Sequence, residues 1–274
     1  MTAAGADLVR SLAAYRVIAG AWVRAALQYR ASFVALTVGQ VLTSGSDFVA
    51  IVLMFTSINT LAGFSLAEIA LLYGLTGLGL GIADLLAGST EQLGRRVRDG
   101  SLDIMLVRPV PTLVQVAADQ FALRRLGRIT QAGGVLVWAL ATLEIDWNAV
   151  RIAVLVLTVA SGAVVYLSVF VLGASFQFLA GDAAEVQNAF TYGGVTLTQY
   201  PLTVYPVEVV RAVTFLLPLA FVNWYPALFL LGRDDPFGLP GWVQLMSPIA
   251  AGLLAVVAAV AWHHGVRHYR STGS

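Results

Sequence analysis

The sequence predicts an all-α integral membrane protein with six transmembrane helices. An N-terminal interfacial helix, a cytoplasmic helix and a re-entrant outer segment complete the predicted fold. Apolar residues make up 58% of the 274 residues and charged residues 11%, whereas soluble domains average about 45–50% and about 25%. Long uncharged stretches recur along the chain, and the arginines gather in three regions. This composition excludes a soluble enzyme, a disordered chain and a basic nucleic-acid-binding protein.

Residues 1–30 predict the interfacial helix. At 100° per residue, aromatic and aliphatic side chains fall on one face and arginines on the other. A helix of this kind lies in the membrane interface, close to anionic headgroups. The alternative is a cytoplasmic helix that packs on a partner. The apolar face holds Leu8, Leu12, Tyr15, Ile18, Trp22, Ala26 and Tyr29, and the polar face Arg10, Arg16 and Arg24.

Residues 31–274 predict the membrane domain. A helical span requires about 20 mostly apolar residues, so we read the spans from the gaps between charges. A seventh apolar stretch, 207–231, is interrupted by Pro218 and Pro226. Because proline breaks the helical hydrogen-bond ladder, we expect this stretch to be a re-entrant hairpin that enters from outside. The six spans are expected near 32–58, 66–87, 126–145, 151–180, 187–204 and 242–264.

The arginines predict the orientation of the chain. Thirteen of the 16 basic residues lie within 1–30, 88–128 and the C-terminal segment. The positive-inside rule places these three regions in the cytoplasm, together with both termini, which requires an even number of spans. The chain contains no lysine and no cysteine. We therefore expect no catalytic residue, metal site or cofactor in this chain, and no nucleic-acid partner.

The inside loop, 88–115, contains a short segment with the pattern of a docking helix. Gly100 and Pro109 bracket SLDIMLVR, in which Leu102, Met105 and Leu106 share one helical face. Asp103 in the first turn and Arg108 in the last turn complement the helix dipole. Such a helix either docks into a partner's groove or packs on its own membrane domain.

Several segments resemble the permease subunits of type-2 ABC exporters, a bacterial group of about 260–270 residues. VRDGSLDIMLVRPV (97–110) is similar to that group's inside-loop motif, R-x-G-x-x-D-x-x-L-x-R-P. GVRHYRSTGS (265–274) is similar to its C-terminal ending. Three further segments resemble it: GFSLAEIALLYG (63–74), YPLTVYP (200–206) and LPLAFVNWYPALFLLGR (217–233). The resemblance covers most of the chain and is least distinctive in residues 1–60.

The resemblance implies a function and its partners. The chain would form the substrate path of an ATP-driven exporter in a bacterial cytoplasmic membrane, with a second permease that is identical or related. Two copies of a separate ATP-binding subunit would hold ATP and Mg, because this chain has no G-x-x-x-x-G-K-[ST] loop. The inside loop would be the coupling element, and the sequence does not indicate the substrate. The expected coupling residues are Arg98, Gly100, Leu102, Asp103, Met105, Leu106, Arg108 and Pro109.

Asp47 is the candidate residue of the substrate path, together with Ser46 and Thr43. A carboxylate near the middle of a span costs about 2.5–3.5 kcal/mol on insertion scales, so it usually faces a cavity or a partner. The alternative is a structural aspartate bonded to the neighbouring hydroxyl groups. Gly77 and Gly81 match a small-residue pattern that allows close helix packing, which the path between two permeases would use.

Two other functions remain open from the residues alone. An ion- or proton-coupled carrier would use Asp47 and need no ATPase. An intramembrane serine hydrolase would pair Ser175 with His263 or His264 on another span.

Overall fold

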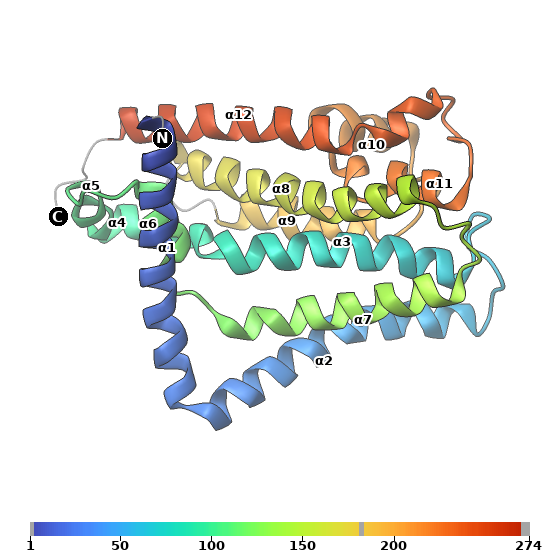
Figure 1. Ribbon diagram of the computed structural model, residues 1–274, viewed down its shortest axis with the longest axis horizontal. Coiled ribbons are helices and arrows are strands. Elements are labelled where there is room, and N and C mark those ends of the chain that lie inside the picture. Colours follow the sequence, from blue (N-terminus) through green and yellow to red (C-terminus); the bar gives the residue numbers. More distant parts are fainter. Residues whose placement is uncertain (1–2, 181–183, 270–274) are drawn as a thin grey trace.

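The computed structural model describes residues 3–180 and 184–269, which form a bundle of helices with one helix lying across its end (Figure 1). The crosswise helix is α1 (Ala3–Gln28). The helices that run along the bundle are α2 (Arg30–Phe55), α3 (Leu66–Ala87), α7 (Leu126–Thr142), α8 (Ala149–Ala180), α9 (Ala184–Thr198) and α12 (Ser247–His268).

These six helices coincide with the six predicted spans, but only four of them are long and apolar enough to cross a membrane by themselves: α2, α3, α8 and α12. α7 has 17 residues and α9 has 15, which at 1.5 Å per residue makes them about 25 Å and about 22 Å long. The hydrocarbon core is about 30 Å thick. The fold is therefore that of a multi-pass, all-α membrane protein, and six crossings stay a prediction.

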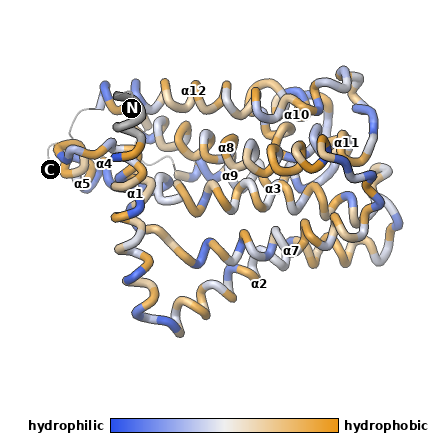
Figure 2. The backbone as a smooth tube through the Cα atoms, in the orientation of Figure 1, coloured by the Kyte–Doolittle hydropathy of each residue, from blue (hydrophilic) through white to orange (hydrophobic). Residues whose placement is uncertain are grey.

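The short helices of the arginine-rich loop lie at the same end of the bundle as α1 and the end of α12 (Figure 1). Figure 2 shows hydrophobic residues along the bundle helices and more hydrophilic ones at the two ends. This arrangement is compatible with an interfacial α1, which remains a prediction. The loop elements are η1 (Gly88–Gln92), α4 (Leu93–Arg98), α5 (Ser101–Leu106), α6 (Thr112–Ala118) and η2 (Leu123–Arg125).

The proline-interrupted stretch is broken into two helical pieces that bend by 79° between Leu216 and Leu219. Pro218 lies at the break, where its ring cannot continue the ladder of the preceding turn. The geometry is that of a broken span or a re-entrant loop, so the re-entrant prediction remains open. The pieces are α10 (Val207–Arg211) with the π-helical turn η4 (Ala212–Leu216), then η5 (Leu219–Phe221) and α11 (Trp224–Leu231).

The centre of the bundle is α3, most of whose residues are buried and which packs closely against α7. A Cβ placed on Gly74 would lie 2.7 Å from Leu136 Cβ, and one on Gly77 would lie 2.7 Å from Ala132 Cβ. Because only glycine leaves this space, the two helices approach backbone to backbone. The pattern that we expected between two permeases thus serves packing within one chain.

At the end of the bundle opposite α1, the buried Glu68 at the start of α3 connects several segments. Glu68 and Ser65 form a reciprocal capping box. Glu68 also forms a 2.6 Å ion pair with Arg233, whose guanidinium lies over the ring of Phe64. Arg233 follows α11, so this cluster joins two of the segments on which the family resemblance rests. The turns η3 (Leu202–Val204) and η6 (Gly241–Leu245) complete this region.

Candidate functional site

The inside loop forms the predicted short helix, α5, with a sharp entry. Gly100 has φ +71°, in the left-handed region that favours glycine. The carboxylate of Asp99 accepts hydrogen bonds from Ser101 N at 3.0 Å and Ser101 Oγ at 2.6 Å. These two bonds lower the pKa of Asp99, so the carboxylate is ionised at neutral pH and fixes the start of the helix.

Leu102 does not lie on an exposed docking face, which corrects the sequence-based expectation. Its side chain is fully buried, in a cluster with Val171 of α8 and Trp262 of α12. Met105 packs partly against the same cluster. The expectation was wrong for Leu102 because the membrane domain itself offers the apolar surface that the cytoplasm lacks.

The apolar side chains that face outward lie on α5 and directly after it, and Leu106 is the only one of them that belongs to the predicted face. Ile104 is 58% exposed, Leu106 37% and Val107 83%. Arg108 and Pro109 follow directly and are also exposed. We call Ile104, Leu106 and Val107 the loop patch. Because three large apolar side chains beside an arginine are rarely left in water without a partner, the patch has the character of an interaction site.

The loop patch stands on a rigid support. Gln115 of α6 donates from Nε2 to the carbonyl oxygens of Met105 and Val110, both at 2.8 Å. At the other side of α5, Tyr269 donates its hydroxyl to Asp103 Oδ1 at 3.0 Å. Asp103, which the sequence assigned to the helix dipole, therefore also connects α5 to the residue after α12.

The support extends into the bundle through further polar contacts. Arg96 pairs with Asp119 at 2.7 Å. Gln177 of α8 accepts from Gly94 N and donates to Gln187 of α9. Through Gly94 of α4, the inside loop is therefore hydrogen-bonded to α8, and through Gln177 this contact continues to α9.

A second candidate site is a small polar cleft of about 130 Å³ among α2, α3, α7 and α9. Asp47 lines this cleft and is exposed in the isolated chain. Tyr73, which also lines it, donates a hydrogen bond from its hydroxyl to Ser44 O at 2.7 Å. The cleft is lined by Thr43, Ser44, Asp47, Tyr73, Gly77, Leu80, Arg128, Gln131, Tyr192, Val195, Thr196 and Gln199.

Two of the three candidate path residues line this cleft. Asp47 and Thr43 belong to it, whereas Ser46 donates to the carbonyl of Thr43 and is not among the lining residues. Sequence reasoning missed the polar partners on the other helices, among them Arg128 and Gln131. Their spacing of three on one helix face is a signal that could have placed them together.

Arg128 is fixed between charged and aromatic groups. It lies 3.7 Å from the buried Asp84, which also pairs with Arg125 at 3.0 Å. The guanidinium lies 5.1 Å from the ring centroid of Tyr192. Arg128 and Tyr192 both line the polar cleft. The cleft therefore contains a cation that its neighbours hold in place, as well as Asp47.

The arrangement gives no support to a serine hydrolase. Ser175 is buried and donates to Val171 O of its own helix at 2.7 Å. Within residues 3–180 and 184–269, neither His263 nor His264 is hydrogen-bonded to it, so the nucleophile lacks a base. The same described residues contain no cluster of three metal-binding side chains.

A comparison with protein families gives one match. The model of the ABC-2 family transporter proteins matches residues 41–273, which include the polar cleft, the inside loop and α12. No curated protein and no solved structure matches the chain. Because the family match covers far more than half of the sequence, the chain belongs to the ABC-2 family of transporter proteins, as a non-catalytic membrane component.

Proposed function

We propose that this chain is one of two permeases in an ATP-driven exporter of a bacterial cytoplasmic membrane, with both termini in the cytoplasm. Family membership supports a transporter permease, and the absence of lysine from the sequence supports a separate subunit for ATP hydrolysis. Two ATP-binding subunits would hold ATP and Mg. Their closure would push on the inside loops and change the packing of the permease pair.

The observation that carries this proposal is the loop patch on its rigid support. The patch presents apolar area to water, while Leu102 and the bond between Tyr269 and Asp103 hold α5 on the bundle. A force on Ile104 or Val107 would thus be transmitted to α8 and α12. A flexible loop would absorb the same force.

The exposed flank of α2 supports a second permease. Its apolar side chains Leu42, Val49 and Leu53 are each more than half exposed. Asp47 is also exposed on this helix. Thr43 and Ala50, which are also exposed, lie between these side chains and Asp47 on the helix surface, so a second permease that packs across this whole face would cover Asp47 and extend the polar cleft into a path. Asp47 and Thr43 would then line the path, and lipid would cover the remaining apolar surface.

The first test changes the loop patch without touching the interior. The double variant Ile104→Asp, Val107→Asp places two charges where the ATP-binding subunit would pack. We expect it to stay folded in the membrane and to lose most of the copurifying ATP-binding subunit, because burying a Leu-sized side chain is worth about 1.5–3 kcal/mol. Export and stimulated ATP hydrolysis should fall together.

The matched control is Val204→Asp in η3, away from the inside loop, where an exposed valine is replaced in the same way. It should retain the ATP-binding subunit at the wild-type ratio. Retention of the subunit by the Ile104→Asp, Val107→Asp variant as well would show that the loop patch is not the coupling surface.

A further inference from the structure

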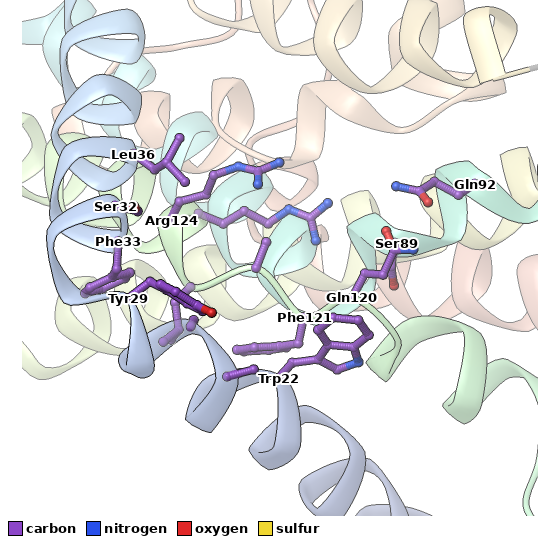
Figure 3. A pocket seen from close by; sticks show the side chains of 15 residues that line it. Trp22, Tyr29, Ser32, Phe33, Leu36, Ser89, Gln92, Gln120, Phe121 and Arg124 are labelled. Carbon is purple, nitrogen blue, oxygen red and sulfur yellow. The ribbon is translucent and has the colours of Figure 1, made fainter.

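A cleft of about 660 Å³ lies in the elbow between α1 and α2, apart from both candidate sites above. Its volume is within the range of about 300–1,000 Å³ that ligand pockets have. Trp22 and Tyr29 come from α1 and its end, Phe33 and Leu36 from α2, and Phe121 from the segment after α6. Figure 3 shows these side chains around an open space, with Trp22 and Phe121 near one end.

The polar side of this cleft carries two neighbouring arginines, of which, within the described residues, one is held in an ion pair and the other is not. Arg125 is paired with Asp84 at 3.0 Å. Arg124 is exposed, and among the described residues no carboxylate lies within ion-pair distance of it. Figure 3 places Arg124 between α2 and Gln92. The cleft thus offers one exposed guanidinium that is not held in an ion pair with any described residue, and a guanidinium can bind phosphate oxygens in a bidentate manner.

The cleft has a polar side and an apolar side, which correspond to the headgroup and the acyl chains of a lipid. The crosswise α1 meets the lengthwise α2 at Tyr29 (Figure 1). With α1 in the membrane interface, as its sequence predicts, this elbow would lie at the transition from membrane surface to membrane interior. Trp22 and Tyr29 are residue types that gather at headgroup level. Phe33 and Leu36 continue along α2 as an apolar surface for acyl chains.

We infer that this cleft binds an anionic glycerophospholipid from the leaflet on the side of the arginine-rich loop. Its phosphate binds Arg124, and its first acyl segments lie along Phe33 and Leu36. A free phosphate would satisfy Arg124 but would leave this aromatic and aliphatic wall uncovered. The bound lipid fills the elbow and so fixes α2 relative to α1, independently of the substrate that is exported.

The test is a titration of the purified full-length chain in detergent, with bound lipid counted by native mass spectrometry. Dioleoylphosphatidylglycerol is the anionic probe and dioleoylphosphatidylcholine the zwitterionic one. We expect the anionic lipid to bind more tightly than the zwitterionic one. Arg124→Gln should weaken the anionic lipid about tenfold, as expected for the loss of a charge-assisted pair, and Arg124→Lys should weaken it less.

Two further variants separate a built site from general attraction. Arg16→Gln removes the same charge from the exposed side of α1, outside the cleft, and should leave lipid binding within about twofold of wild type. Ser32→Trp fills the cleft without changing its charge and should displace the lipid. Unchanged helical content and melting temperature establish that each variant is folded.

Four results would overturn the inference. Equal losses in Arg124→Gln and Arg16→Gln would show surface attraction only. Equal affinity for the two lipids, or full binding in Ser32→Trp, would show that the cleft does not recognise an anionic lipid. Displacement of the lipid by millimolar inorganic phosphate would assign Arg124 to a free anion.

Discussion

The hydrogen bond from Tyr269 to Asp103 joins the residue after α12 to the helix of the inside loop. Tyr269→Phe removes only the hydroxyl. We expect the amides of α5 to exchange hydrogen about fivefold faster, because a net hydrogen bond is worth about 1 kcal/mol. Hydrogen-exchange mass spectrometry of the purified protein measures this directly.

Tyr29→Phe is the matched control for this experiment. Tyr29 is 71% exposed and its hydroxyl has no hydrogen bond within the described residues. Its removal should leave exchange in α5 unchanged. If Tyr269→Phe also leaves exchange unchanged, Asp103 does not fasten the loop helix through this bond.

The sequence predicted the features of the inside loop that depend on neighbouring residues. It did not predict which side chains would pack against helices that are remote in sequence. Gly100 and Asp103 lie at the start of a short helix, as expected from the sequence pattern. Leu102 was assigned to an exposed face, since periodicity groups it with Leu106 but does not say which direction points to the bundle. Only the positions of Val171 and Trp262, on helices remote in sequence, decide that.

At the scale of elements, the close contact of α3 with α7 determines how tightly the bundle packs. Gly74→Ala would place a methyl group 2.7 Å from Leu136 Cβ and 2.9 Å from Leu136 Cα. Because backbone must then shift, we expect a loss of about 1–3 kcal/mol in stability, as in other overpacked cores. A lower melting temperature in detergent is the measurement.

Gly134 on α7 provides the control, since a Cβ there has nothing within 4 Å. Gly134→Ala should be neutral or stabilising by up to about 1 kcal/mol, because alanine favours the helix. Equal melting temperatures for Gly74→Ala and Gly134→Ala would contradict the close approach of the two helices.

The positions of the helices could be predicted from charge gaps, because a lipid-facing segment excludes charged residues over a whole span. The break at Pro218 was likewise visible in the sequence. The polar cleft was not, since Asp47, Arg128 and Tyr192 come from three helices whose relative rotation depends on side-chain packing. Glu68 and Asp84 lie near the two ends of α3, and ion pairs with arginines on remote segments allow both to be buried, which the charge gaps do not reveal.

At the scale of the whole molecule, α1, the arginine-rich loop and the end of α12 gather at one end of the bundle (Figure 1). The distribution of the arginines predicts that these segments lie on one side of the membrane. Ion pairs at both ends then hold the bundle: Glu68 with Arg233 at one, and Asp84 with Arg125 at the other. Under the proposed coupling, a push on α5 would act on helices that these ion pairs hold together at both ends.

The loop patch is the proposed contact with an ATP-binding subunit, and because this chain contains no cysteine, a single introduced cysteine can test that contact directly. Val107→Cys, in a complex purified with its ATP-binding subunit, should form a crosslink to that subunit with a short bifunctional thiol–amine reagent. Val204→Cys, an exposed valine away from the inside loop, should form none. A crosslink from Val204→Cys, or none from Val107→Cys in an intact complex, would contradict the proposed coupling surface.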